Sequence, residues 1–480
     1  MVITSGAYRS LGDDEPVEVS DNICKRICSM AADYKAVLIP AVGNLSAGYN
    51  ICNIGYVVQL MRLEHPVPRW AAPAFSASCL FGAFMGQVVL GWTGDRYGRR
   101  LSLVATHLIL AAGALCSSLF TAGYGDDVWL TLVHWRFVLG IGVGGTLPLN
   151  AVFAGEMEDE RGLGRVSRVA MATAFMIAGY VLAPVLMLLI VVALGSDKVT
   201  EEPWATELGW RFLLGVGAVP SLVAVRAILV APDIIDDGPR DGSRSIVATL
   251  RDAAVTVLDD PQYTRRLAAA AGSLFCFNFA FYGAVIYLPH ILHTVVDKED
   301  RGEELLVVGS LAAAGINAAA IPGALMAARL IVDDGIGRKR LQLLSFGLMT
   351  IGYVILGLTY PSLRRAGAVL ETTALFGGLF FCLSSGAGIT TYILPQEAFP
   401  ADVRSTIIAF AAASGTVGAT LSSYAFAPMA RQFGLPFAFF CSAAAAACGA
   451  LVTWRLTDDS DQLDPLGVEE DEGSRRRRPP

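Results

Sequence analysis

The chain has 480 residues, of which 54% are hydrophobic and 16% are charged, and its formal net charge is −7. Soluble domains carry about 25% charged residues, so this composition excludes an ordinary soluble domain and indicates a protein embedded in lipid. The acidic balance gives no reason to expect a nucleic-acid partner.

Long apolar segments recur along the whole chain, and the charged residues cluster between them. A helix of about 20 apolar residues crosses a bilayer, and backbone groups in lipid must be satisfied within the segment, so each segment must be a helix. The sequence therefore predicts an all-α membrane protein with twelve transmembrane helices. These lie at 36–61, 70–92, 101–123, 128–155, 167–194, 209–231, 267–293, 305–331, 341–360, 368–394, 404–428 and 434–456.

The remaining segments are polar. Residues 1–35 form an N-terminal tail with acidic residues in place of the apolar core of a signal peptide, 232–266 form a central loop and 457–480 a C-terminal tail. Lys and Arg are more frequent in the loops on the side that holds both tails and the central loop. The positive-inside rule then predicts that both termini are cytoplasmic, in the plasma membrane or an internal membrane.

Two loops share a charged pattern about half a chain apart. GWTGDRYGRR occupies residues 91–100 and VDDGIGRKR occupies residues 332–340, and both contain D-x-x-G-R followed by Arg or Lys. Many secondary transporters are built from internal repeats of this kind, with the solute between them at the membrane midplane. The repeat predicts two pseudo-symmetric six-helix bundles, 36–231 and 267–456.

The repeated loops can act as a conformational latch. A second charged pair, in GEMEDERG after the fourth span and PQEAFPADVRS after the tenth, recurs at nearly the same spacing. Loop carboxylates can pair with arginines of neighbouring helices, holding the cytoplasmic face closed in one state. The alternative is that the charges only signal topology. The candidate latch residues are Gly91, Asp95, Arg96, Gly98, Arg99, Arg100, Asp334, Gly337, Arg338, Lys339, Glu156, Arg161, Glu397 and Arg404.

These loops resemble the signature loops of the major facilitator superfamily, over nearly all of 36–456. Four further stretches resemble the phosphate:proton symporter family within it. The resemblance implies twelve helices in two bundles and transport by alternating access. The stretches are RFVLGIGVGGTLPLNAVFAGE (136–156), GWRFLLGVGAVP (209–220), NFAFYG (278–283) and ITTYILPQEAFPADVRST (389–406).

The residues that bind phosphate and protons in the resembled family are largely replaced. Its seventh span carries W-x-x-x-D-x-x-x-Y, which aligns with Leu274, Asn278 and Tyr282, so only the tyrosine is kept. The other aligned positions are Ala47 and Asn50 for two acids of the first span, Thr146 and Leu147 for an acid and a tyrosine of the fourth, Ala178 for a glutamine, Gly388 for an asparagine and Thr416 for a lysine. The resemblance therefore implies an altered substrate or altered coupling.

The residues alone lead to the same expectation, because no Asp or Glu stands in the middle of any span. A proton-coupled carrier usually needs a buried carboxylate. His107 could titrate instead, although a lone histidine near a helix end is more often structural. The sequence thus favours a uniporter, an exchanger, or a carrier coupled through the charge of its own substrate.

Neutral polar side chains remain inside the spans. Asn278 and Tyr282 are four residues apart and share a helix face. Such groups can bind a small polar solute, or they can cross-link helices. The candidate solute-binding residues are Asn278, Tyr282, Asn150, Gln87, Asn50, Tyr49 and Thr390.

The predicted function is secondary transport of a small polar solute by alternating access, through uniport or exchange. One alternative is proton-coupled symport of inorganic phosphate or a related anion, and another is a non-transporting receptor on the same scaffold. The sequence contains no HExxH, nucleophile motif or phosphate-cradling loop, so we expect no enzyme, no catalytic residues, no cofactor and no metal. The expected partners are a small polar solute or anion and the lipid bilayer, and a monomer is sufficient.

Overall fold

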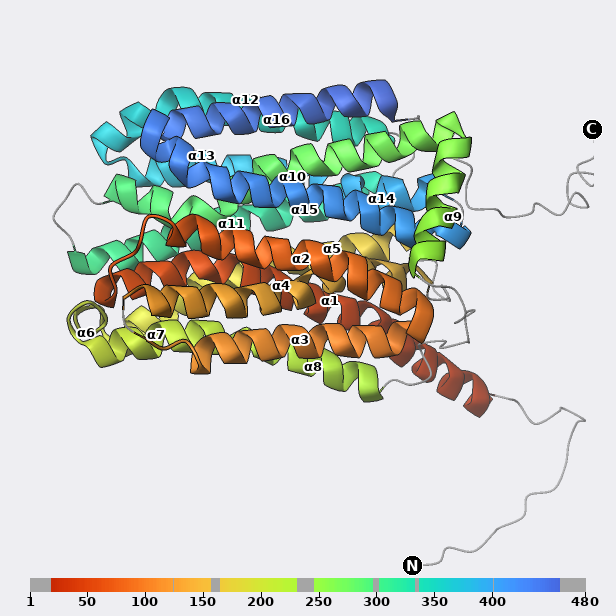
Figure 1. Cartoon of the computed structure of the whole chain (residues 1–480), viewed down its shortest axis with the longest axis horizontal. Helices are drawn as coiled ribbons and strands as arrows, with labels where there is room; N and C mark the ends of the chain where they lie inside the picture. Colours follow the sequence, from red (N-terminus) through yellow and green to blue (C-terminus); the bar gives the residue numbers. More distant parts are fainter. Residues whose placement is uncertain are drawn as a thin grey trace, which may run out of the picture.

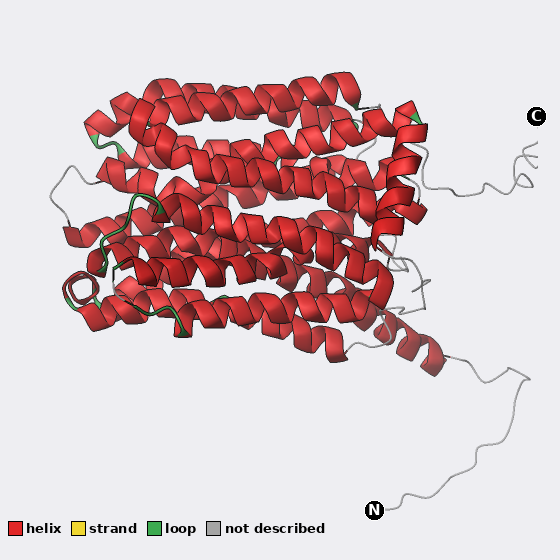
Figure 2. Cartoon of the chain, viewed as in Figure 1, coloured by secondary structure: helices red, strands yellow, loops and turns green. Residues whose placement is uncertain are grey.

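The computed structural model describes residues 19–123, 125–156, 165–230, 246–296, 302–332, 336–399 and 401–457. All regular structure in these segments is α-helical (Figure 2), which confirms the predicted fold class. The first helices are α1 (Val19–Glu64), α2 (Ala71–Tyr97), α3 (Arg99–Leu119), α4 (Asp126–Glu156), α5 (Arg165–Leu194), α6 (Ser196–Glu201), α7 (Pro203–Val216) and α8 (Ala218–Val230). They are followed by α9 (Ile246–Asp259), α10 (Pro261–Val296), α11 (Gly302–Val332), α12 (Arg338–Ala366), α13 (Val369–Ser384), α14 (Ala387–Ala398), α15 (Ala401–Phe433) and α16 (Leu435–Leu456).

The helices form two bundles that lie side by side (Figure 1). We call α1–α8 the N-half and α10–α16 the C-half. The halves meet where α5 packs along α11 and α2 packs along α15, with α1 and α10 also in contact. Short α6 lies at one end of the molecule and α9 crosses the other, and these are called the α6 end and the α9 end (Figure 1).

Within the described residues, 11 helical stretches are long and apolar enough to cross a membrane, one fewer than expected. The stretch that falls short belongs to α1, because Asn44, Ser46, Asn50 and Asn53 lower its hydropathy. The helix still forms along its full expected length, and all four polar side chains are buried against neighbouring helices. Polar cross-links take the place of apolar packing there.

Two spans that the sequence presents as continuous are each built from two helices. The span expected at 209–231 is broken between α7 and α8 at Gly217, whose carbonyl oxygen accepts hydrogen bonds from Ser46 Oγ at 3.2 Å and Asn50 Nδ2 at 2.9 Å. The span expected at 368–394 is broken between α13 and α14, next to Gly386. A methyl group at Gly386 would lie 2.8 Å from the Leu341 carbonyl oxygen, so α12 approaches this break too closely for a side chain.

Helix also extends into two segments that we expected to be polar tails or loops. α1 begins at Val19, inside the expected N-terminal tail, and the central loop contains α9. α9 is anchored by apolar packing: Val257 lies in a small buried cluster with Phe399 and Ile407. The hydroxyl of Thr264 also donates to the Val257 carbonyl at 2.6 Å, which fixes the turn between α9 and α10.

Glycines let α2 and α4 pack with their backbones in contact. A methyl group at Gly144 would lie 1.9 Å from the Ala83 carbonyl oxygen, and one at Gly86 would lie 2.0 Å from that of Ile141. The C-half repeats this arrangement, since a methyl group on Gly323 of α11 would lie 2.5 Å from the Phe381 carbonyl oxygen of α13. Small residues at such crossings are how membrane helices reach close packing.

The two signature loops have the same local conformation. Gly98 precedes α3 with φ 94° and ψ 153°, and Gly337 precedes α12 with φ 74° and ψ 147°. Only glycine adopts this region readily, which explains why each copy of the motif contains it. The equivalence of these residues is independent support for the two-fold repeat.

Candidate functional site

Asn278 and Tyr282 lie on α10 where the two halves meet, with 4% and 5% of their surfaces exposed. Asn278 lies beside Tyr392 of α14, and Tyr282 lies near Tyr392 and beside Tyr180 of α5. We call Tyr180, Asn278, Tyr282 and Tyr392 the tyrosine–amide cluster. It joins side chains from three helices and both halves.

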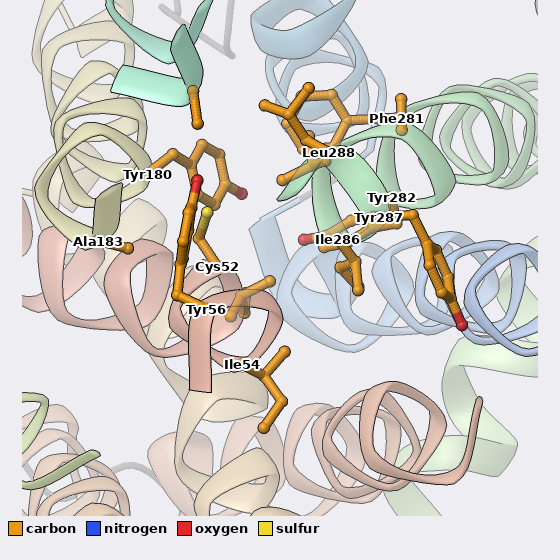
Figure 3. Close-up of a cluster of buried hydrophobic side chains, with 14 of the residues drawn as sticks. Cys52, Ile54, Tyr56, Tyr180, Ala183, Phe281, Tyr282, Ile286, Tyr287 and Leu288 are labelled. Atoms are coloured by element: carbon orange, nitrogen blue, oxygen red, sulfur yellow. The ribbon is translucent and has the colours of Figure 1, made fainter. Parts of the chain in front are cut away.

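Tyr392 and Tyr180 are the two members of this cluster that are not among the predicted solute-binding residues. Tyr180 lies on α5. Its ring packs 5.7 Å from that of Phe281, centroid to centroid, so α5 faces α10 here (Figure 3). Its hydroxyl is buried and has no hydrogen-bond partner of suitable geometry among the described residues. The position could have been found, because it is two residues beyond Ala178, the residue aligned with a family glutamine.

Gln87 is connected to the cluster by two neighbouring residues of α15. Thr416 Oγ1 donates to Gln87 Oε1 at 2.9 Å, which links the two halves. The residue before it, Gly415, faces Asn278, since a methyl group there would lie 2.5 Å from Asn278 Nδ2. The structure thus brings three of the predicted solute-binding residues, Asn278, Tyr282 and Gln87, to the interface between the halves.

Tyr49 and Asn50 instead hold the N-half together. The Tyr49 hydroxyl donates to the Leu213 carbonyl at 2.6 Å, and Asn50 Nδ2 donates to the Gly217 carbonyl at 2.9 Å. Both side chains have no measurable exposure. Their hydrogen bonds go to the broken span α7–α8, so they act as helix cross-links in this conformation.

Asn150 and Thr390 are also buried, and neither has a described contact with a member of the tyrosine–amide cluster. Asn150 Nδ2 donates to Asn44 Oδ1 at 2.9 Å, beside Gly43 and His107 in the N-half. Thr390 Oγ1 donates to the Gly386 carbonyl within its own helix at 3.2 Å. Neither residue has a described hydrogen bond to the other half.

A buried guanidinium stands among neutral groups in the N-half. Arg136 is 1% exposed and donates to Asn53 Oδ1 at 3.2 Å and to the carbonyl oxygen of Asn50. None of the buried side chains in the described residues is an Asp or Glu.

A cavity of about 280 Å³ lies between the halves at the α6 end. Its walls come from α1 and α2 of the N-half and from α10, α12, α15 and α16 of the C-half. None of the predicted solute-binding residues lines it. The sequence does not reveal this cavity, because its basic residues come from four separate helices and only the fold brings them together.

The candidate latch residues that the structure describes lie at the α9 end. Gly91 faces Ala409 of the other half, where a methyl group would lie 3.6 Å from the alanine methyl. Arg96 lies over the rings of Trp92 and Tyr97, at 5.2 Å and 5.4 Å. Arg100 donates to the Leu229 carbonyl at 3.1 Å, and so ties α3 to α8.

Several latch residues have only their backbone described. Asp95, Glu156, Glu397 and Arg404 lie on α2, α4, α14 and α15, and their side chains are outside the description, as are Arg161 and Asp334 entirely. Arg99 is 5% exposed, and Arg338 and Lys339 open α12. The charge pairs of the latch therefore stay a prediction.

Known proteins similar to this chain were compared with it. The family model for sugar (and other) transporters matches residues 36–458. The probable inorganic phosphate transporter 1-6 of Arabidopsis thaliana is 25% identical over 474 residues, covering 88% of this chain and 91% of its own length. The inorganic phosphate transporter PT2 of Toxoplasma gondii is 28% identical over 439 residues, covering 88% and 72%.

Solved structures with the same fold include two of the xylose transporter XylE. The proton:xylose symporter bound to 6-bromo-6-deoxy-D-glucose has a TM-score of 0.67 at 20% identity, covering 90% of this chain and 97% of its own. The partially occluded inward-open form from E. coli has a TM-score of 0.67 at 19% identity, covering 89% and 98%. The predicted resemblance to the major facilitator superfamily is confirmed: this chain is a multi-pass membrane transporter and belongs to the sugar (and other) transporter family.

Proposed function

We propose that the protein moves a small polar solute by alternating access of its N-half and C-half, as a uniporter or exchanger. In this proposal the solute binds at the tyrosine–amide cluster, where the halves meet. The α9 end is cytoplasmic, together with both termini, because its loops hold the greater share of Lys and Arg.

The observation that carries the proposal is the neutral character of the interior. Asn278, Tyr282 and Gln87 offer amide and hydroxyl groups at the interface between the halves, while the buried side chains among the described residues include no Asp or Glu. Intramembrane carboxylates are the usual proton carriers of coupled transporters. Amide and hydroxyl groups can bind a polar solute through hydrogen bonds. Without a titrating acid beside them, they suit a solute that is moved without protons.

Proton-coupled transport of inorganic phosphate is the second candidate. It is favoured by the relatives named as inorganic phosphate transporters. Against it stands the cost of burying an anion where the described cluster offers no cation. The buried guanidinium group of Arg136 already donates hydrogen bonds to Asn53 and Asn50 of the N-half.

Solute counterflow in proteoliposomes tests the proposed function. The panel contains sugars, polyols, amino acids and inorganic phosphate. Each is loaded unlabelled at high concentration inside and supplied labelled at low concentration outside, with protein-free liposomes as the control. We expect counterflow of at least one neutral or zwitterionic solute. Counterflow of none of them, together with thermal stabilisation by one, would identify a non-transporting receptor instead.

The latch predicts a transport defect in Asp95→Asn. Removing one charge-assisted hydrogen bond costs about 1.5 kcal/mol, so counterflow should slow about tenfold while the melting temperature in detergent changes little. Asp197→Asn is the matched control, since Asp197 is exposed on α6 at the opposite end. Equal counterflow rates in the two variants would remove Asp95 from the latch.

A further inference from the structure

The cavity at the α6 end has a cationic rim. Arg62 of α1, His290 of α10, Arg364 of α12 and Arg431 of α15 all line it, and all four are exposed. Three of these helices belong to the C-half and one to the N-half. The rim therefore places basic side chains of both halves on opposite sides of one opening.

These basic groups act on one another across the opening. The guanidinium groups of Arg62 and Arg431 are close enough for their like charges to repel each other. No Asp or Glu is among the residues lining the cavity. The nearby acid on α1, Glu64, interacts instead with His65 and with Glu207 and Arg211 of α7.

The rim arginines also have no partner in the described part of the chain. The side chains of Arg62, Arg364 and Arg431 make no hydrogen bond or ion pair with any residue that the structure describes. Guanidinium groups bind carboxylates and phosphates through paired N–H donors. Several guanidinium groups therefore share one cavity whose described lining contains no acid. A bound anion would supply the negative charge that they lack.

The deeper wall of the cavity is apolar. Ile54, Phe75, Ile286 and Phe426 line it, with the ring of Tyr287 stacked on that of Phe426 at 5.1 Å. Small-molecule sites are mostly apolar pockets of about 300–1,000 Å³ with a few polar groups that orient the ligand. At about 280 Å³, this cavity is close to that range and larger than a bare inorganic ion requires.

We propose that this cavity binds an organic anion, with a carboxylate or phosphate head group held by Arg62, Arg431 and His290 and an apolar body against Phe75, Ile286 and Phe426. This goes beyond the proposed function, because binding here requires no transport. The ligand would touch both halves at once. Closing the α6 end brings Arg62 toward Arg431, and their repulsion is offset when an anion lies between them.

Three matched probes test the ligand class. Full-length protein in nanodiscs of zwitterionic lipid is titrated by calorimetry with phenyl phosphate, with inorganic phosphate as the head group alone, and with phenol as the body alone. Phenyl phosphate should bind at least about tenfold more tightly than either part. If inorganic phosphate binds as tightly as phenyl phosphate, the apolar wall contributes nothing and the proposal is wrong.

Substitutions in the cavity test whether phenyl phosphate binds there. Arg62→Gln and Arg431→Gln should each weaken phenyl phosphate binding about tenfold or more. Arg69→Gln makes the same charge change at an exposed position outside the cavity and should leave binding unchanged. Arg431→Lys keeps the charge if the glutamine variant fails to fold, and should lose less affinity. Wild-type affinity in both cavity variants overturns the site.

Changing the lipid distinguishes a soluble anion from a lipid head group as the ligand. Binding of phenyl phosphate should be the same in nanodiscs that contain phosphatidylglycerol, and competitive displacement by that lipid would assign the rim to a lipid head group instead. The outcome is independent of the proposed function. Counterflow that persists without phenyl phosphate binding contradicts only this site, and binding without any counterflow contradicts only the transport proposal.

Discussion

Gly144→Ala should destabilise the folded protein by about 3 kcal/mol. The added methyl group would lie 1.9 Å from the Ala83 carbonyl oxygen and 2.7 Å from the Ala83 Cα. These are backbone atoms of α2, so no side chain can rotate out of the way. α2 and α4 would have to separate, and the close packing between these two helices would be lost.

The matched control is Gly347→Ala in α12, where a methyl group meets nothing within 4 Å. That change should be neutral or slightly stabilising, because alanine favours the helix by about 1 kcal/mol over glycine. Thermal unfolding in detergent, followed by size-exclusion chromatography, compares the two variants. Equal melting temperatures would show that α2 and α4 are not locked by backbone contact.

Asn278→Ala should weaken binding of the transported solute about tenfold, which corresponds to the loss of about 1.4 kcal/mol, with a smaller loss of stability. The amide lies beside Tyr392 and Gly415, one turn from Tyr282, where the halves meet. The solute to use is the one that gives the strongest counterflow in the panel, and its affinity is read from the concentration dependence of counterflow.

Asn50→Ala is the comparison, because that amide donates to the Gly217 and Ser46 carbonyl oxygens. Losing both bonds should lower the melting temperature and leave solute affinity nearly unchanged. The two variants should therefore show opposite patterns. If Asn278→Ala lowers stability more than affinity, the amide is a helix cross-link and the solute site lies elsewhere.

The fold could be predicted from the sequence because membrane helices have a strong and local signal. Long apolar segments locate the spans, and the repeated D-x-x-G-R loops locate the two halves. Gly98 and Gly337 show why the repeat is readable: each adopts a positive φ that other residues rarely tolerate. The breaks at Gly217 and Gly386 escaped prediction, because both depend on close approach of a distant helix.

The site was only partly predictable. Asn50 and Asn278 look alike in sequence, as amides in apolar spans. Asn50 bonds to the broken span of the N-half, whereas Asn278 packs against Gly415 of α15, next to the residue that links the two halves. Which partner each finds depends on tertiary packing. The basic rim of the cavity could not be predicted for the same reason. Arg62 and Arg431 lie far apart in the chain, and only the fold brings both to one cavity.

The most direct test of the central claim is net solute uptake measured with and without a protonophore. Proteoliposomes receive the best solute of the panel from outside, and a pH-sensitive dye inside reports any proton movement. We expect equal net uptake in both conditions and no solute-driven change in internal pH. Solute-driven acidification, with uptake that collapses when the proton gradient is removed, would contradict it and establish proton-coupled symport.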